Sequence, residues 1–167
     1  DAPAWGPGLR EVVSLYAGGA DVAAPVAALE AQRQPVKGSF NGTDFTDLRD
    51  GDDVLAPCLE MLFGGNAWWV DWRFVAKLQA QPMKTLRDAY WMPFTVTLAD
   101  AEGSSFEAYV PTTYVDTHAS ESEPLRLGLE TEWVERQGVV RGLGRRVLYV
   151  DGDPRDLLEL RELVIHG

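Results

Sequence analysis

The sequence contains a single cysteine, Cys58, among its 167 residues. One thiol cannot form a disulfide within the chain, which excludes a disulfide-stabilised scaffold. Cys58 lies in the apolar segment VLAPCLEMLF, so we expect a buried, unreactive thiol rather than a nucleophile. The chain also lacks an apolar run of about 18 residues, so we expect no transmembrane helix. It does not open with the basic and apolar segments of a secretory signal.

Positive charge is scarce as well. Lysine and arginine number 15 against 26 aspartates and glutamates, which gives a formal net charge of -11. Nucleic acids and anionic membranes bind basic surfaces, so this balance argues against both as partners. An acidic surface suits a basic protein partner, although most acidic proteins are simply soluble. We therefore expect a soluble protein that binds neither nucleic acid nor membrane.

The residues of common catalytic and metal sites are sparse. There are two histidines, His118 and His166, and neither belongs to a zinc-ligand spacing or a nucleophile motif. Five aspartates lie within residues 44–53, but without the Asp-x-Asp-x-Asp-Gly spacing of a calcium loop. A capped helix start and ion pairs with Arg49 or with arginines elsewhere account for that run. We predict no metal, no cofactor and no enzymatic activity.

Residues 1–34 predict a helical hairpin. The segment PGLREVVSLYAGG has a proline near its start and two glycines at its end. In the next segment, ADVAAPVAALEAQR, Asp21 can cap the helix and Pro25 falls in the first turn. Apolar residues recur at helical spacing in both segments; they are Leu9, Val12, Val13, Tyr16, Val22, Val26 and Leu29.

Beyond residue 34 the patterns favour strands. The Asn41-Gly42 pair predicts a β-hairpin. A further helix is expected to begin at Asp52 or Asp53 and to continue through VLAPCLEMLF. The following segment, NAWWVDWRF, alternates with a period of two and predicts a strand. Its inward face would carry Trp68, Val70, Trp72 and Phe74, and its accessible face would carry Trp69, Asp71 and Arg73.

The remainder of the chain completes an α+β prediction. We expect a strand over 75–81, a turn or short helix over 84–91, a hairpin over 94–115, a surface loop over 116–124, a tight turn at 142–146, a strand and turn over 145–154, and a final strand over 157–167. The predicted class is α+β: an N-terminal helical hairpin, then a mostly antiparallel β-rich domain with one or two short helices. The predicted boundary separates 1–34 from 35–167.

Several motifs, in order, resemble the ImpE family, also called SciE or TagJ. The segment GSFNGTDFTDLRDGDDVLAPCLEMLFGGNAWWV is similar to the family signature, and LRDAYWMP, LRLGLETEW, GLGRR and LLELREL follow in the family's order. The resemblance covers about residues 36–165. It implies that residues 1–34 are the last helices of a helical, tetratricopeptide-like N-terminal part.

The resemblance also implies a function. Members of this family are cytoplasmic, non-enzymatic accessory proteins of the bacterial type VI secretion system. They are thought to bind the small sheath subunit TssB through its N-terminal helix and to influence recruitment of the ATPase ClpV. The candidate partner-binding residues that follow are Arg49, Asp50, Asp52, Trp69, Arg87 and Asp88.

Two other classes remain as alternatives. A carbohydrate- or peptide-binding module would use Trp69 and neighbouring side chains on an exposed sheet face. A small hydrolase would use Asp50, Asp52 or Glu60, and a carboxylate with a strongly raised pKa in a cleft would favour it.

Overall fold

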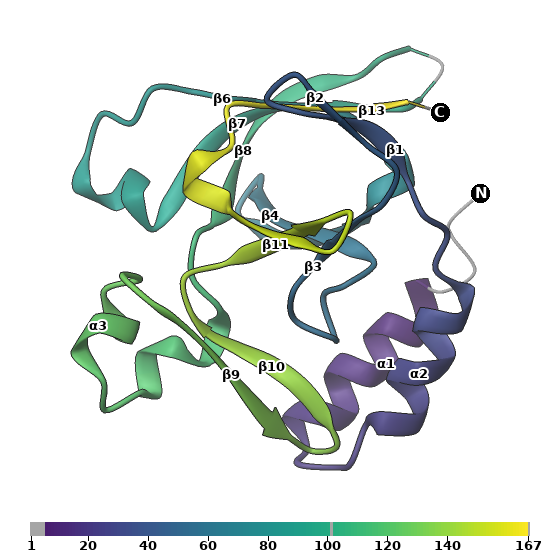
Figure 1. The fold of residues 1–167 in the computed structure, drawn as a ribbon, viewed down its shortest axis with the longest axis vertical. Coiled ribbons are helices and arrows are strands. Elements are labelled where there is room, and N and C mark those ends of the chain that lie inside the picture. Colours follow the sequence, from purple (N-terminus) through teal and green to yellow (C-terminus); the bar gives the residue numbers. More distant parts are fainter. Residues whose placement is uncertain (1–5, 101, 167) are drawn as a thin grey trace.

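The structure is a computed structural model that describes residues 6–100 and 102–166 (Figure 1). Residues 1–5 of the predicted helical segment therefore lie outside the described residues. The α-helices are α1 (Gly6–Ala17), α2 (Ala23–Gln32) and α3 (Glu123–Arg126); the 3-10 helices are η1 (Trp72–Phe74), η2 (Leu86–Ala89), η3 (Val115–Ala119) and η4 (Leu157–Glu159). The strands are β1 (Lys37–Phe40), β2 (Thr43–Phe45), β3 (Leu48–Asp50), β4 (Cys58–Phe63), β5 (Asn66–Asp71), β6 (Val75–Ala80), β7 (Trp91–Leu98), β8 (Ser105–Pro111), β9 (Thr131–Arg136), β10 (Val139–Gly144), β11 (Val147–Val150), β12 (Asp153–Asp156) and β13 (Glu162–His166).

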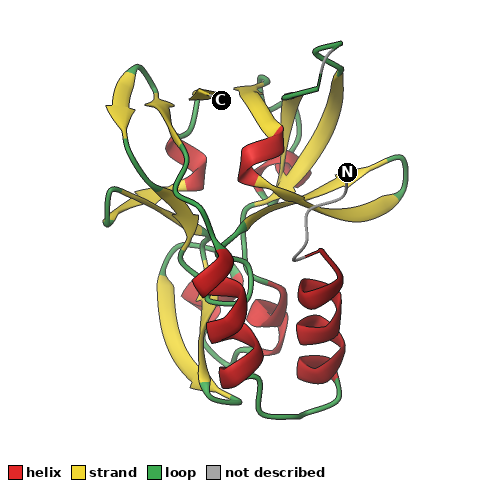
Figure 2. Cartoon of the chain, turned by 90° about the vertical axis from the view of Figure 1, so that its right-hand side faces the viewer, coloured by secondary structure: helices red, strands yellow, loops and turns green. Residues whose placement is uncertain are grey.

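The predicted α+β class, led by a helical hairpin, is wrong. Antiparallel pairing organises the described residues into an eight-stranded sheet of order β2-β1-β13-β6-β7-β8-β4-β5, a three-stranded sheet β12-β11-β3 and a two-stranded sheet β10-β9. The large sheet curls round one side of the core, and α1 and α2 lie at one end of the molecule (Figure 1; Figure 2). The protein is a mostly antiparallel β fold to which short helices are added.

The two N-terminal helices end where the sequence indicates. Gly18 and Gly19 follow α1, and Gly19 has a φ of 81°, which a side chain would disfavour. Asp21 accepts a hydrogen bond from the backbone N–H of Ala23 at 2.9 Å, so it supports the start of α2. Both helices bury their apolar stripe against β10 and the 54–58 segment, in a small second core with Tyr114.

The helix predicted from Asp52 is a turn followed by a strand. Asp52 does act as a cap, because its carboxylate accepts from the N–H groups of Val54 and Leu55 at 3.0 and 3.3 Å. The turn ends at Pro57, and Cys58 begins β4, which pairs with β5 and β8. A short apolar run does not by itself distinguish a buried strand from a helix, and strand pairing decides here.

The tryptophan-rich strand is shorter than predicted. β5 ends at Asp71, whose carboxylate accepts from the N–H of Arg73 at 2.8 Å and starts η1. Trp72 is buried, with 3% of its surface exposed, as predicted. The inward placement of Trp68 is wrong, because β5 is the edge strand and leaves 49% of that side chain exposed. Phe74 is also exposed, because the 3-10 turn breaks the alternation.

The C-terminal segment also divides into two elements. The alternation of apolar and charged residues after Leu157 suggests one strand, but Asp156 accepts from the N–H of Leu158 at 2.9 Å and starts η4. β13 then pairs with β1 and β6 in the centre of the large sheet. The structure confirms four other predicted elements: the strands near 75–81 and 147–150, the hairpin of β7 and β8, and the short helix at 86–89. The predicted loop over 116–124 instead contains η3 and the start of α3.

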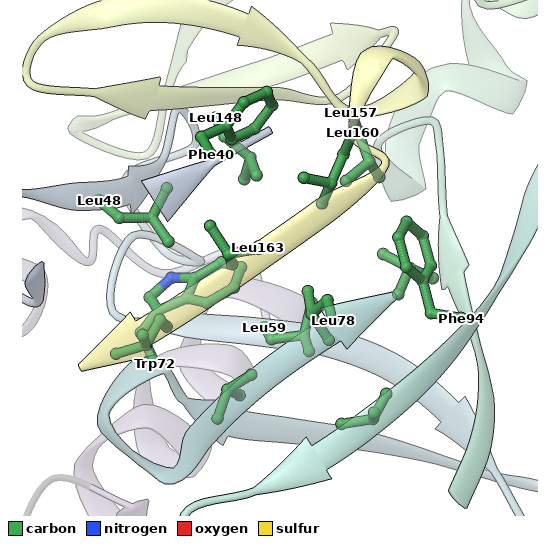
Figure 3. Close-up of a cluster of buried hydrophobic side chains, with 14 of the residues drawn as sticks. Phe40, Leu48, Leu59, Trp72, Leu78, Phe94, Leu148, Leu157, Leu160 and Leu163 are labelled. Carbon is green, nitrogen blue, oxygen red and sulfur yellow. The ribbon is translucent and has the colours of Figure 1, made fainter. Parts of the chain in front are cut away.

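The main hydrophobic core lies between the large sheet, the three-stranded sheet and η4 (Figure 3). Phe94, Leu78, Leu160 and Leu163 are fully buried in it. Burying a side chain of this size contributes about 1.5–3 kcal/mol relative to leaving it in water. This core fixes β4, β7 and β8 from within, so the opposite face of the same strands is held rigidly toward solvent.

Candidate functional site

The face of the large sheet that points away from the core carries apolar and aromatic side chains. Because residues paired across antiparallel strands share a face, the registers place them side by side. The pairs are Glu60 with Trp69, Leu62 with Ala67, Leu62 with Tyr109, Pro93 with Tyr109, and Trp91 with Pro111. The exposed face of an antiparallel sheet is usually polar, so an aromatic strip there points to a binding surface.

A groove of about 490 Å³ runs between this strip and the segment containing η3 and α3. The sheet contributes Leu62, Ala67, Trp91 and Pro111, while the opposite wall contributes Val115, His118 and Arg126. Trp91 remains partly exposed at the groove, and Val115 is more exposed still. The groove is open and predominantly apolar, as sites for peptides and other apolar ligands are.

Hydrogen bonds fix the wall formed by η3 and α3. The Thr117 hydroxyl accepts from the N–H of Gly144 at 2.8 Å, which ties η3 to the end of β10. One Nη of Arg126 donates to the carbonyls of Ser120 and Glu121 at 2.8 and 3.0 Å. Pro124 falls in the first turn of α3, where its missing N–H costs no hydrogen bond. Hydrogen bonds therefore hold this wall of the groove in a defined conformation.

The floor of the groove holds one carboxylate, that of Glu60, and both of its oxygens have partners within the protein. The indole N–H of Trp69 donates to one oxygen at 3.2 Å, and the Arg146 guanidinium pairs with the other. Arg146 is only 2% exposed and also lies 3.8 Å from Asp50. Because its charge is compensated from inside the protein, Glu60 leaves the groove suited to apolar groups rather than to a lone cation.

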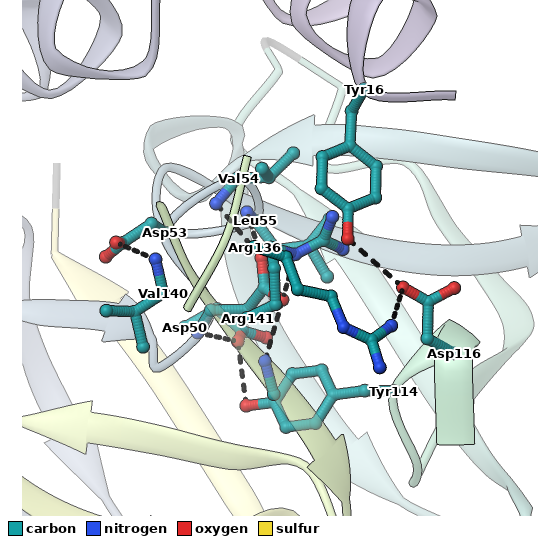
Figure 4. A network of polar contacts seen from close by, with 12 residues as sticks. Tyr16, Asp50, Asp53, Val54, Leu55, Tyr114, Asp116, Arg136, Val140 and Arg141 are labelled. Atoms are coloured by element: carbon teal, nitrogen blue, oxygen red, sulfur yellow. Dashed lines mark hydrogen bonds and ion pairs between the residues drawn. The ribbon is translucent and has the colours of Figure 1, made fainter. Parts of the chain in front are cut away.

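A buried polar network lies beneath this floor (Figure 4). Asp50 accepts from the Tyr114 hydroxyl at 3.0 Å and from the N–H of Asp52 at 2.9 Å. Burial raises the pKa of Asp50 to about 6, and the nearby charge of Arg146 partly opposes the rise. Burial likewise raises the pKa of Tyr114, so its hydroxyl stays protonated and acts as a donor. These groups hold the Tyr114 ring, which lines the groove.

Asp52 connects this network to β10 and the helices. Its carboxylate accepts from Arg141 Nε at 2.6 Å and from the N–H of Gly142 at 3.1 Å. The Arg141 guanidinium lies over the ring of Tyr16 in α1, 4.1 Å from its centroid. Charge-assisted hydrogen bonds of this kind are short and strong when buried. Asp52 therefore joins three parts of the chain and is not accessible to a partner.

Three of the six sequence-predicted site residues belong to this internal scaffold. Besides Asp50 and Asp52, Arg49 donates to the Asp53 carboxylate at 3.1 Å and to the carbonyl of Asp50 at 3.1 Å. None of the three lines the groove. The expected pairing of the aspartates with arginines elsewhere is confirmed, since Asp50 lies near Arg146 and Asp47 is bonded to Arg33 at 2.6 and 3.0 Å.

The other three residues border the aromatic strip. Trp69 lies at one end, with 38% of its surface exposed. At the other end the Arg87 guanidinium lies 5.1 Å from the centroid of the Tyr109 ring and donates to the Tyr109 hydroxyl at 3.3 Å. Asp88 closes a capping box with Thr85 at the start of η2. Hydrogen bonds from the N–H groups of Lys84 and Thr85 hold its pKa at about 2.

The carboxylates considered for a hydrolase are poorly placed for catalysis. Asp50 has a raised pKa, but it lies 1% exposed in an ion network rather than in a cleft, and Glu60 is paired with Arg146. Within 6–100 and 102–166, no group of three or more histidines, cysteines or acidic residues is arranged to hold a metal ion. Cys58 is buried as predicted, and burial raises the pKa of its thiol.

Sequence reasoning missed the residues that build the groove from below. GLGRR at 142–146 is not a tight turn, because it ends β10 and supplies buried Arg146. Gly142 is required because a Cβ there would lie 2.2 Å from the ring of Tyr114. The aspartate run was the available signal, because buried carboxylates require cationic partners. The two buried arginines, Arg141 and Arg146, flank the segment Gly142–Gly144.

Most of the chain matches one known protein family. The sequence model of the ImpE protein family matches residues 42–164. The chain belongs to the ImpE family. That match includes both strands of the tryptophan hairpin, the groove wall and the buried arginines.

Two similar proteins extend the match beyond the family model. The type VI secretion system accessory component TagJ of Pseudomonas aeruginosa is 31% identical over 161 residues, which is 95% of this chain and 56% of that protein. An X-ray crystal structure of protein VPA1032 from Vibrio parahaemolyticus is 27% identical, with a TM-score of 0.82 over 96% of this chain and 60% of that one. The chain thus spans little more than half the length of the relatives that it matches. Among the described residues, no helix is long and apolar enough to cross a membrane.

Proposed function

We propose that this ImpE-family chain acts as a non-enzymatic accessory component of a bacterial type VI secretion system, in the cytoplasm, by binding a protein partner. The similarity to TagJ over 95% of the chain supports the role. The observation that carries the proposal of binding is the apolar groove of about 490 Å³ on the outer face of the large sheet. A surface of this kind is unusual on a soluble β protein that binds nothing.

The proposed partner is the small sheath subunit TssB, bound through its N-terminal helix. An amphipathic helix would place apolar side chains against Leu62, Trp91 and Val115, and its polar face would remain in water. The wall of the groove carries exposed Glu121 and Glu123, which would attract basic residues of that helix. Binding at this site would in turn influence recruitment of the ATPase ClpV to the sheath.

The candidate residues then have distinct proposed roles. Trp69 and Arg87 would contact the partner at the two ends of the aromatic strip, and Asp88 would position Arg87 through η2. Arg49, Asp50 and Asp52 would act indirectly, by holding the scaffold beneath the groove. We also propose that residues 1–34 end a longer helical part and that residues 35–167 form the ImpE-like domain.

A binding titration tests this proposal. A fluorescently labelled peptide of the TssB N-terminal helix is titrated with this chain and with its full-length parent, and fluorescence anisotropy is recorded. We expect saturable binding to both. Trp91→Ala should weaken binding at least about tenfold, because truncating a central aromatic anchor costs about 2 kcal/mol or more.

Phe74→Ala is the matched control, because Phe74 and Trp91 are equally exposed aromatic residues and Phe74 lies outside the groove. Its affinity should equal that of the wild type. Equal weakening in both variants would contradict the groove as the site. If neither the chain nor its parent binds the peptide, the proposed partner is wrong.

A further inference from the structure

One edge of the large sheet is unusually exposed and uncharged. The strand order ends at β5, so β4 pairs with one side of β5, and within residues 6–100 and 102–166 no strand pairs with the other side. Residues 66–70 of β5 carry no charge and no proline, and Asn66, Ala67, Trp68 and Trp69 are all exposed. Natural sheets usually protect such edges with charge, proline or short length, because an open edge can pair with another strand.

The other sheet edges among the described residues carry that protection. β2 is three residues long and includes Asp44, and β12 contains Pro154 with charged neighbours. β3 carries Arg49 and β9 carries Arg136 within the strand.

The outer edge of β10 is occupied, because its N–H groups donate to the side chains of Asp53, Asp52 and Thr117. The single charge of β5, on Asp71 at its end, is buried and paired with Arg73. Because the other edges are protected and the edge of β5 is not, we interpret the edge of β5 as an interaction surface.

The hairpin geometry determines which backbone groups this edge offers. Gly64 and Gly65 form a two-residue turn with φ values of 59° and 80°, closed by the pair Phe63–Asn66. In such a hairpin the closing pair is hydrogen-bonded and the pattern alternates along the strand. Asn66, Trp68 and Val70 therefore bond to β4, and the N–H and C=O groups of Ala67 and Trp69 point outward from the sheet.

We propose that the β5 edge pairs with the β5 edge of a second copy of this chain. A two-fold axis through Trp68 sets Ala67 opposite Trp69 of the second copy and Trp68 opposite its own equivalent. Both outward-pointing residues then form hydrogen-bonded pairs, which gives four backbone hydrogen bonds in all. Small Ala67 leaves room for the Trp69 ring on the outer face, and the two Trp68 side chains meet at the axis.

Charge favours a second copy at this edge over any other face. The chain carries a net charge of -11, so two copies repel each other over most orientations. Residues 61–70 form a ten-residue stretch without charge, and its exposed part lies on the hairpin of β4 and β5. Two copies can approach there without placing carboxylates face to face. The pairing keeps the outer faces of both sheets on one side, so the two grooves would open in the same direction.

Sedimentation of the purified chain tests this inference without any other partner, and so independently of the proposed function. We expect a monomer–dimer equilibrium over micromolar to millimolar concentrations, strengthened by added salt because salt screens the repulsion. Ala67→Pro removes an outward N–H while leaving the bonds to β4, and should weaken the dimer roughly tenfold or more. Ala67→Ser keeps the N–H and should leave the dimer intact.

A cysteine substitution tests the register. Trp68→Cys should give an interchain disulfide under mild oxidation, because facing residues at such a position lie close enough for one. Asn66→Cys is the matched control: the same register sets Asn66 opposite Val70, so its two copies are too far apart. Buried Cys58 does not interfere. A monomer at all concentrations, a dimer that survives Ala67→Pro, or equal cross-linking through residues 66 and 68 would overturn the proposal.

Discussion

Arg146 compensates one fully buried carboxylate, that of Asp50, and one partly buried carboxylate, that of Glu60. It pairs with Glu60 beneath the groove and lies near Asp50 in the network that holds Tyr114. A buried ion pair contributes little net stability, because desolvation offsets the attraction, but removing one partner leaves a buried charge uncompensated. The groove floor is thus most sensitive to loss of this single cation.

Replacing Arg146 with methionine should lower the free energy of unfolding by about 3–5 kcal/mol. Urea denaturation followed by fluorescence measures the change. Arg87→Met is the matched control, because Arg87 pairs with Asp88 while its side chain is 64% exposed. Exposed pairs contribute about 0–1 kcal/mol, so this variant should stay near the wild type. Equal effects of the two substitutions would refute the role assigned to Arg146.

The titration of Asp50 should be visible in the stability of the protein. Its pKa in the folded state is about 6, above the roughly 3.9 of an exposed aspartate, so between these values the folded state binds the proton more tightly than the unfolded chain. The contribution of Asp50 to the free energy of unfolding therefore rises as the pH falls from about 7 to 4. Residue 50 cannot titrate in the variant Asp50→Asn. Measured at several pH values, the free energy of unfolding of the wild type should therefore increase relative to that of the variant as the pH falls. A constant difference would contradict this.

At the scale of elements, the hairpin of β9 and β10 connects the helices to the sheets. Its tip receives the turn between α1 and α2: the side-chain amide of Gln137 donates to the carbonyls of Tyr16 and Ala20 at 2.9 and 2.6 Å. The N–H of Val22 donates in return to the carbonyl of Gln137 at 2.9 Å. The base of the same hairpin contributes Gly142 beneath Tyr114. One element therefore supports both the helix contact and the groove.

Gln137→Ala should loosen the helices without unfolding the sheets. The loss of two side-chain hydrogen bonds leaves two carbonyls without that donor, at a cost of about 1–2 kcal/mol. Hydrogen exchange should accelerate in α1 and α2 and remain unchanged in β6 and β7. Glu135→Ala, at an exposed position on β9, provides the control. Faster exchange throughout the molecule would mean that the helices are not a separately opening unit.

Gly142→Ala tests the other end of the same element. The added Cβ would lie 2.2 Å from the Tyr114 ring, so the ring must move and the groove floor must change shape. We expect lower stability by about 1–3 kcal/mol and weaker binding of the TssB peptide. Val140→Ala, an exposed position on the same strand, should affect neither. Unaltered stability and binding in Gly142→Ala would show that the contact with Tyr114 is unimportant.

At the scale of the whole molecule, local patterns predicted some elements well and their assembly less well. The hairpin of β7 and β8 and the helices near 6–17 and 23–32 have strong periodicity or clear end signals, so they were predictable. The strand at 58–63 and the exposure of Trp68 depend on which strands pair and which one lies at the edge, and periodicity alone does not carry that information. The predicted α+β class failed for the same reason.

For the candidate site, too, the sequence indicated some residues but not how the fold brings them together. The acidic run supplied two candidate site residues, Asp50 and Asp52, but both are buried and lie beside Arg146 and Arg141, about 90 residues further along the chain. Long-range pairing of this kind is set by the fold. The groove itself combines residues from β4, β7, β8 and η3, so no single segment of the sequence contains it.

Hydrogen–deuterium exchange of the chain with and without the TssB N-terminal helix shows directly whether the helix binds in the groove. We predict slower exchange in β4, at the start of β7 and in η3, which surround the groove, with little change in β11 and β12. Protection confined to the helices or to the three-stranded sheet, with the groove unchanged, would contradict it.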